Sequence, residues 1–269
     1  MPTSPQTRTK SESEVKQKQS GPASAVQSDP SVRKGDARKY QAWVAKAAKQ
    51  PMVLEPVDLG PFGAEDVEIA VEHCGVCHSD LSVLNNDWGL SQYPAILGHE
   101  VIGRISAIGS NAKGLTVGQR VGVGWTSGSC MHCHQCMSGH HHLCPQVQFT
   151  IVGHRGGFAT HIRVHWAWTF PIPEKLNFAE AGPLLCGGVT VFSPLAMYAK
   201  PTDRVGIIGI GGLGHMAVKF AAAFGCDVTA FTSSASTFDD AKRFGAHHVV
   251  VSKDHSTVTA SHTIMVDVQ

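Results

Sequence analysis

Charged residues are scarce in this sequence, and neither sign is in excess. Of the 269 residues, 22 are Lys or Arg and 21 are Asp or Glu, which gives a formal net charge of +1. No basic stripe alternates with aromatic residues, so we expect no nucleic-acid partner. Long apolar runs are also missing. None reaches the roughly 18 residues that a membrane-spanning helix needs, so we expect no membrane association.

The first part of the chain has almost no large apolar residues. Residues 1–36 are rich in Ser, Gln, Lys, Pro and Thr, and such a segment buries too little surface to offset the entropy of ordering it. We therefore predict a disordered tail over 1–36. It contains no apolar stretch that could act as a secretory signal. We expect a cytoplasmic, reducing location, where clustered thiols are metal ligands rather than disulfides.

The rest of the chain predicts two folded domains. Its length exceeds one average domain, and 42% of all residues are hydrophobic, which favours a large buried core. Residues 37–190 combine short strands with glycine-rich turns, typical of a mainly β domain. The strands that we expect there include one with the alternation of a half-buried strand, and they span residues 67–71, 101–108 and 120–123.

In residues 191–269 the apolar residues follow a different pattern along the chain. Strands and helices alternate there, which predicts a parallel sheet and, with the first domain, an α/β protein. We expect strands at 204–208, 227–231, 248–251 and 264–268, and helices at 212–224 and 238–244. A doubly wound dinucleotide fold has six strands in the order 3-2-1-4-5-6. The expected strands supply the first half and a fourth strand, so we expect a partial fold with an open apolar edge.

Four cysteines lie within one short loop. Their spacing is Cys130-x2-Cys133-x2-Cys136-x7-Cys144. Zn²⁺ prefers four tetrahedral soft ligands, and short spacings allow one loop to wrap the ion. Because protein atoms fill all four positions, the pattern predicts a structural zinc without a water ligand. The neighbouring histidines are expected to be exposed loop residues, because four sulfurs complete the shell; they are His132, His134 and His140 to His142.

A second group of metal-ligand types is spread along the chain. Cys77 lies in Gly-Val-Cys-His-Ser-Asp, His99 in Gly-His-Glu, and Cys186 in Pro-Leu-Leu-Cys-Gly-Gly. Three protein ligands and one open position describe a catalytic zinc. On spacing alone the signal is weak, because a buried Cys and a hydrogen-bonded core His are common.

A glycine-rich loop follows the strand expected at 204–208. Gly209, Gly211 and Gly214 form a G-x-G-x-x-G pattern that also contains Gly212 and Leu213. Between a strand and a helix, this pattern predicts a tight turn, a close approach to a pyrophosphate, and close helix–strand packing. The pyrophosphate is expected at the helix N-terminus, where free N–H groups favour anions. A flexible glycine loop without a ligand is the alternative.

The end of the second strand decides which dinucleotide is favoured. An acidic residue there would bind the ribose 2′-hydroxyl of NAD(H) and disfavour a 2′-phosphate. This chain has Thr232, Ser233 and Ser234 instead. We therefore favour NADP(H) over NAD(H). No cation for the 2′-phosphate follows directly, and Lys242 and Arg243 are the candidates.

In combination and order, these motifs resemble zinc-dependent medium-chain alcohol dehydrogenases, and most of all the cinnamyl-alcohol-dehydrogenase-like branch. The resemblance covers Tyr40 to the end. It implies a GroES-like catalytic domain over 37–190 and a Rossmann domain over 191–269. It also implies oxidoreductase activity that interconverts primary alcohols and aldehydes, aromatic or aliphatic, with NADP(H), one catalytic zinc and one structural zinc.

The resemblance also assigns roles to single residues. Cys77, His99 and Cys186 would bind the catalytic zinc, and Glu100 would replace water as a resting ligand. Among the residues after Cys77, Ser79 would relay the alcohol proton, Asp80 would orient His99, and His78 would lie near the cofactor phosphates or the proton exit. Two aromatic side chains, Trp88 and Trp125, would form walls of the substrate pocket, although core packing explains either equally well.

Three further expectations concern the protein as a whole. Members of the family form homodimers through a C-terminal segment that the expected elements do not include, so a dimer of this chain is in doubt. A non-catalytic fragment that retains the zinc sites is one alternative, and a polyol dehydrogenase of the same superfamily is another. The two Trp residues favour aromatic or apolar aldehydes over polyols.

Overall fold

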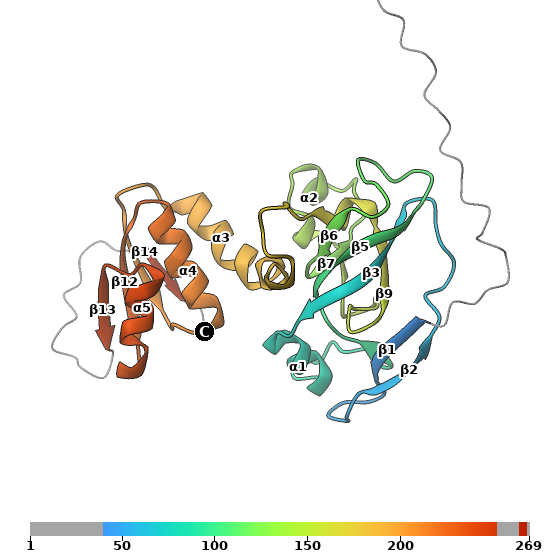
Figure 1. The fold of residues 1–269 in the computed structure, drawn as a ribbon, viewed down its shortest axis with the longest axis horizontal. Helices are drawn as coiled ribbons and strands as arrows, with labels where there is room; N and C mark the ends of the chain where they lie inside the picture. Colours follow the sequence, from blue (N-terminus) through green and yellow to red (C-terminus); the bar gives the residue numbers. More distant parts are fainter. Residues whose placement is uncertain (1–39, 252–263, 268–269) are drawn as a thin grey trace, which may run out of the picture. The chain divides into compact units, whose positions relative to one another are not determined.

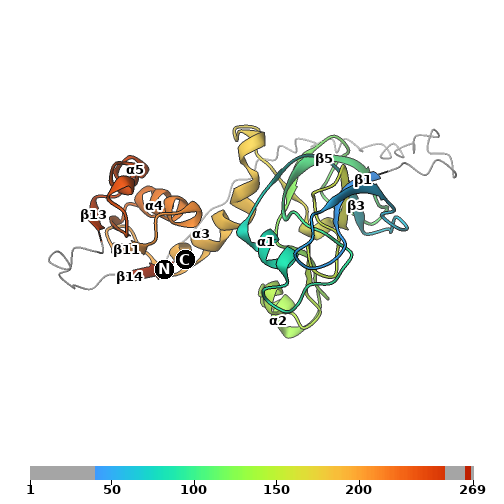
Figure 2. The same ribbon diagram turned by 90° about the horizontal axis from the view of Figure 1, so that it is seen from below.

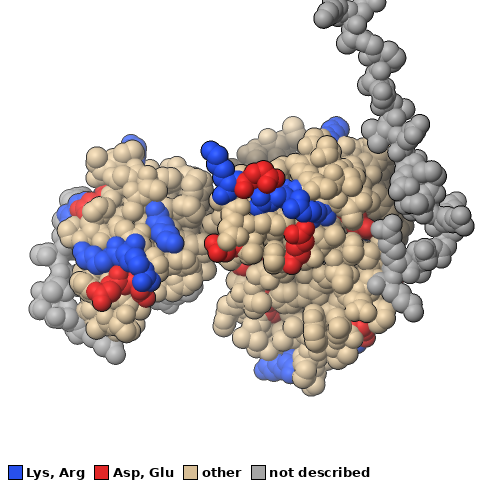
Figure 3. All heavy atoms as spheres, viewed as in Figure 1, with Lys and Arg blue, Asp and Glu red and all other residues tan. Residues whose placement is uncertain are grey.

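A computed structural model of the chain describes residues 40–251 and 264–267. The expected tail therefore lies outside the described residues. We call residues 40–186 the β-rich module, and residues 187–251 with 264–267 the α/β module. Within the described part of the chain, no helix is long and apolar enough to cross a membrane. On the face in Figure 3, acidic and basic side chains adjoin one another, and neither sign dominates the drawn surface.

The β-rich module consists mainly of short antiparallel strands (Figure 1). Its strands are β1 (Tyr40–Ala45), β2 (Val53–Val57), β3 (Asp66–Gly75), β4 (Ala95–Ile96), β5 (Glu100–Ile108), β6 (Arg120–Val123), β7 (Thr126–Gly128), β8 (Gln148–Phe149), β9 (His161–His165) and β10 (Phe170–Pro171). Its helices are α1 (His78–Asn85) and α2 (His134–Met137), with short 3₁₀ turns η1 (His141–Leu143), η2 (Trp166–Trp168), η3 (Phe178–Glu180) and η4 (Gly182–Leu185).

One five-stranded sheet organises this module, in the order β10-β6-β5-β3-β9. All of its neighbouring strands pair antiparallel. Side chains from its central strands form a core of fully buried aliphatic residues, among them Val67, Ile69, Val101, Ile105, Val121 and Ile162. Each such side chain contributes about 1.5–3 kcal/mol on burial. The sheet is therefore the rigid support from which the loops with Cys and His ligands extend.

Strand β3 differs from the half-buried strand that its alternation predicts. The pattern places Glu68 on the solvent side, yet this residue is 3% exposed. Its carboxylate accepts hydrogen bonds from Arg163 Nε at 2.8 Å, Tyr40 Oη at 2.9 Å and Ser106 Oγ at 3.0 Å. A buried charge must be paired to be tolerated, and a facing guanidinium from β9 provides this pairing. The alternation therefore fails here because a polar cluster replaces solvent.

From residue 204 on, the α/β module follows the predicted alternation of strands and helices, whereas its first helix was not predicted. It contains α3 (Gly187–Tyr198), β11 (Arg204–Ile208), α4 (Gly212–Ala223), β12 (Asp227–Thr232), η5 (Ala235–Thr237), α5 (Phe238–Phe244), β13 (His248–Val251) and β14 (Ile264–Asp267). The strands are parallel in the order β13-β12-β11-β14, which is 3-2-1-4 in chain order. This is the first part of the doubly wound arrangement.

Helix α4 packs its small residues against the sheet. Gly214, Ala217, Val218 and Ala221 are buried, at the spacing of one helix face. They join Val205, Ile207 and Val228 in the core of this module. Figure 2 shows α4 and α5 on the same side of the strands. The carboxyl end of β11 and the N-terminus of α4 consequently meet at the glycine loop.

Candidate metal and cofactor sites

The first metal-ligand group is built around the start of α1. Cys77 is the N-cap residue of this helix. Asp80, three residues later, turns back, and its Oδ2 accepts a hydrogen bond from the Cys77 N–H at 2.9 Å. This hydrogen bond satisfies the Cys77 N–H, a donor that has no backbone acceptor within the helix. The Cys77 backbone is thereby fixed by a carboxylate that is only 3% exposed.

The same carboxylate also holds His99. Oδ1 of Asp80 accepts hydrogen bonds from the Gly98 N–H at 2.9 Å and from Nδ1 of His99 at 3.0 Å. Because the Nδ1 proton is directed at a carboxylate, the lone pair of Nε2 is left for a metal ion. Gly98 has a φ of +92°, a conformation that favours glycine over other residues. Asp80 thus joins the Cys77 turn to the His99 turn.

Cys186 comes from a distant part of the chain and completes the group. It follows η4 and precedes α3, and its Sγ lies 3.2 Å from Nε2 of His99 and 3.9 Å from Sγ of Cys77. Ligands of a tetrahedral zinc with Zn–S of about 2.3 Å and Zn–N of about 2.0 Å lie roughly 3.5–3.8 Å apart. The ligand atoms of Cys77, His99, Glu100 and Cys186 all lie within 4.8 Å of one another. The residues therefore fit one zinc ion.

The electrostatics of this group also suit a cation. Burial, followed by the neighbouring Cys77 sulfur, raises the pKa of the Cys186 thiol to about 12. Burial also raises the pKa of Glu100. A bound divalent cation would offset both costs, because it stabilises thiolate and carboxylate directly. Gly75 makes room for Glu100, since a Cβ there would lie 1.9 Å from Glu100 Oε2.

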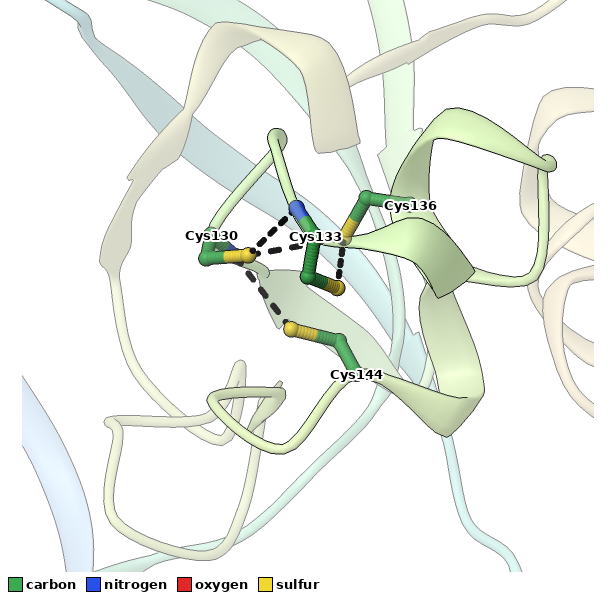
Figure 4. Close-up of side chains that lie close together, drawn as sticks. All are labelled: Cys130, Cys133, Cys136 and Cys144. Atoms are coloured by element: carbon green, nitrogen blue, oxygen red, sulfur yellow. Dashed lines mark hydrogen bonds between the residues drawn. The ribbon is translucent and has the colours of Figure 1, made fainter.

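The four-cysteine lobe (residues 130–144) forms the second group. Figure 4 shows the four thiols converging from the loop around α2. Sγ of Cys133 lies 3.5 Å from Sγ of Cys136, and Sγ of Cys130 lies 3.9 Å from the latter. All eight cysteines of the chain are thiols. The ligand atoms of Cys130, Cys133, Cys136 and Cys144 lie within 4.8 Å of one another, which again fits one tetrahedral ion.

Backbone amides around the lobe are directed at the sulfurs. The Cys133 N–H donates to Cys130 Sγ at 3.3 Å, and the Gln146 N–H donates to Cys144 Sγ at 3.3 Å. A hydrogen bond from the His132 backbone is the main cause that lowers the pKa of Cys130 to about 6. Such bonds favour the thiolate, which is the form that binds metal.

A cavity of about 760 Å³ adjoins the first metal group. Both predicted pocket residues, Trp88 and Trp125, line it, as do Ser79 and Cys186. The ring of Trp125 also packs edge-on against His99, with centroids 5.0 Å apart. His78, in contrast, is exposed on the first turn of α1 and is absent from the lining. The cavity has the size and apolar character of a small-molecule site.

Several lining residues were not predicted. They include Trp168, Phe170, His142, Leu184 and Leu185. The two leucines could have been found, because they directly precede Cys186 in the sequence. The other three come from η2, β10 and η1, whose approach to the cavity depends on long-range packing and leaves no local signal.

The glycine loop has the geometry that its pattern predicts. Gly209 has a φ of +84° and its N–H donates to Phe231 O at 3.0 Å. Gly211 is the N-cap of α4, and Gly212 and Leu213 begin the helix. Gly214 is buried in the helix face. First-turn N–H groups of α4 therefore open beside the end of β11, as anion binding requires.

The two serines at the end of β12 differ from Thr232 in their exposure to solvent. Thr232 is 6% exposed, and its hydroxyl lies 2.6 Å from that of Thr237. Ser233 and Ser234 are exposed, and the Ser234 hydroxyl accepts a hydrogen bond from the Ser236 N–H at 3.3 Å. The two candidate cations are engaged elsewhere: Arg243 pairs with Asp240 at 2.7 Å, and Lys242 donates to His247 O.

Comparison with known proteins identifies the class. The alcohol dehydrogenase GroES-like domain matches residues 63–174, and the zinc-binding dehydrogenase domain matches residues 212–268. The chain belongs to the zinc-binding medium-chain alcohol dehydrogenase family, a family of oxidoreductases. The predicted fold, a GroES-like domain followed by a Rossmann-type sheet, is confirmed.

Individual relatives agree with this assignment. An aldehyde reductase from Synechocystis sp. is 48% identical over 225 residues, covering 83% of this chain and 66% of the relative. A cinnamyl alcohol dehydrogenase from Sorghum bicolor has a TM-score of 0.80 at 38% identity, covering 86% of this chain and 69% of the other. CAD from Helicobacter pylori, complexed with NADP(H), has a TM-score of 0.79 at 28% identity, covering 85% and 68%. The chain spans about two thirds of the length of such relatives.

Proposed function

We propose that this chain interconverts aldehydes and primary alcohols by hydride transfer with NADP(H), at a zinc held by Cys77, His99 and Cys186. The convergence of these three side chains beside an apolar cavity supports the proposal most strongly. The aldehyde reductase and cinnamyl alcohol dehydrogenase relatives agree with this reaction class. The three tryptophans in the cavity wall favour aromatic or apolar aldehydes over polyols.

The chemistry of the reaction comes from the bound groups. When bound, zinc acts as a Lewis acid toward the substrate oxygen, and the nicotinamide supplies or accepts the hydride. The chain contributes orientation: Asp80 fixes the His99 tautomer and the Cys77 backbone together. The ring of Trp125, packed edge-on against His99, would shield that side of the metal group from bulk water. Glu100 is a further carboxylate within reach of the ion.

Ser79 is the group that we assign to the proton. Its side chain lines the cavity on the first turn of α1. The Ser79 hydroxyl would pass the alcohol proton between the substrate oxygen and the exposed side. His78, exposed on the same turn, is the adjacent acceptor. The role of Ser79 places the first proton transfer at the cavity wall, and His78 would pass the proton on to solvent.

We assign the cofactor phosphates to the glycine loop Gly209 to Gly214. The open first turn of α4 supplies N–H donors for the pyrophosphate. NADP(H) is favoured over NAD(H) because Ser233 and Ser234 stand where a carboxylate would repel a 2′-phosphate. The NADP(H) complex of the Helicobacter pylori relative supports the same choice.

We assign the second zinc to the four-cysteine lobe, with a structural role. Four thiols complete a tetrahedral shell, so no position is left for substrate. Eight thiols without a disulfide agree with a reducing cytoplasmic location.

The proposal is tested with the zinc-loaded chain and its Cys77→Ser variant. NADPH oxidation is followed at saturating benzaldehyde, and zinc is counted by mass spectrometry. We expect turnover and two zinc ions per chain for the parent, and one zinc ion with no turnover for Cys77→Ser. Turnover in a Cys77→Ser chain that has lost one zinc ion would refute the assignment. A parent that binds both zinc ions yet reduces no aldehyde, or that oxidises only polyols, would refute the proposed reaction.

A further inference from the structure

The four-cysteine lobe reaches the substrate cavity through one side chain. His142 lies in η1, two residues before Cys144, and it lines the cavity next to the first metal group. It is also exposed to solvent. An exposed residue that lines a cavity stands at its mouth. The lobe is therefore part of the cavity wall as well as a candidate zinc site.

Two contacts of the neighbouring His141 hold this turn in place. Nδ1 of His141 lies 3.2 Å from Oγ of Ser129. Its ring meets the ring of Trp168 edge-on, with centroids 5.3 Å apart at 90°, an arrangement worth about 0.5–1.5 kcal/mol beyond burial. Trp168 lines the same cavity. These contacts join the lobe to the cavity wall and fix the backbone turn that carries His142.

Away from the metal group, the polar side chains of the cavity lining include Thr126, Trp168, Thr190 and Ser193 as well as His142. Ser79 and Cys186 belong to the metal end, and the Thr190 hydroxyl donates to Cys186 O at 2.8 Å. The His142 ring meets the His140 ring edge-on at 5.9 Å, and no hydrogen bond to its nitrogens is found among the described residues. An imidazole has one donor and one acceptor nitrogen when neutral. Both are left for a ligand at the mouth of the cavity.

We propose that His142 is a specificity-determining residue. Its ring forms a hydrogen bond with a polar group at the end of an aldehyde farthest from the carbonyl. The substrate class is thereby narrowed to aldehydes with an apolar body and a distal hydroxyl or similar group. The inference rests on the proposed function, since it assumes that the carbonyl lies at Cys77, His99 and Cys186. A hydrogen bond of this kind changes kcat/KM by about three- to tenfold.

The test compares two aldehydes of equal size. 4-(Hydroxymethyl)benzaldehyde and 4-ethylbenzaldehyde differ only by a hydroxyl in place of a methyl group. We expect His142→Phe, which keeps a ring but removes both nitrogens, to lower kcat/KM about three- to tenfold for the first and to change the second by less than about twofold. His134→Phe is the matched control, because His134 is exposed on the same lobe but does not line the cavity.

A binding measurement separates this proposal from the proposed function. Quenching of tryptophan fluorescence by 1,4-benzenedimethanol and by 4-ethylbenzyl alcohol gives dissociation constants without turnover, and the zinc content shows that the lobe is intact. Equal losses for both members of each pair in His142→Phe would overturn the role of His142. A selective loss of diol affinity in a chain that turns over no aldehyde would leave that role standing and refute the proposed reaction.

Discussion

Asp80→Asn tests whether one carboxylate organises the first metal group. The two oxygens of Asp80 accept three N–H groups, from Cys77, Gly98 and His99. An asparagine side chain has a single oxygen. In the better of its two orientations this oxygen keeps Gly98 and His99, and the amide NH₂ then faces the Cys77 N–H. The hydrogen bond from the Cys77 N–H is then lost, and this N–H faces the new amide NH₂, which is also a donor.

The magnitude follows from this count. A hydrogen bond to a charged acceptor contributes about 1.5–3 kcal/mol. His99 also loses its anionic partner, which makes its Nε2 a weaker ligand, and changes of this kind reduce metal affinity by about 10- to 100-fold. Since 1.4 kcal/mol corresponds to a factor of ten, the two values agree. We therefore expect Asp80→Asn to bind zinc at the first group about 10- to 100-fold more weakly.

The assay equilibrates parent and variant in chelator-buffered zinc and counts bound ions by mass spectrometry. The four-cysteine lobe serves as an internal reference, because Asp80 does not contact it. Asp87→Asn is the control variant, since Asp87 is exposed just beyond α1. If Asp80→Asn holds two zinc ions at the same free concentration as the parent, the reasoning about the shared carboxylate is wrong.

Three further outcomes are expected. Glu68→Gln should lower the free energy of unfolding by about 3 kcal/mol at pH 7, because Arg163 loses its buried counter-charge. Although burial opposes ionisation, hydrogen bonds from Arg163, Tyr40 and Ser106 lower the pKa of Glu68. Its stabilisation is therefore complete above the unfolded pKa of about 4.3 and disappears as the pH falls through the folded value; equal urea midpoint differences at pH 7 and pH 3.5 would contradict this. Cys144→Ser should retain one zinc ion and melt at a lower temperature, and two retained ions would count against a four-thiol site. Ser233→Asp should shift the kcat/KM ratio toward NADH by about tenfold or more through repulsion of the 2′-phosphate, and an unchanged ratio would show that the end of β12 does not contact the cofactor.

From residue 204 on, the α/β module could be predicted from the sequence almost residue by residue, whereas helix α3 was not predicted. Its strands and helices are continuous, and the period of each is strong; α5 and β13 have the predicted bounds. The four-cysteine lobe could be predicted for a related reason, because all its ligands lie within 15 residues of sequence. In both cases the information is local, so chain connectivity alone brings the residues together.

The sequence by itself determined which ligand types are present and, for the lobe and the glycine loop, how they are arranged. Only the tertiary structure decided that Cys186 meets Cys77 and His99, because the contact spans 109 residues and depends on how two distant turns pack. Tertiary packing also buried Glu68 against Arg163 and brought His142 to the cavity. The periodicity of one segment does not show which residue of another strand will face it. Such placements are therefore decided only when the sheet forms.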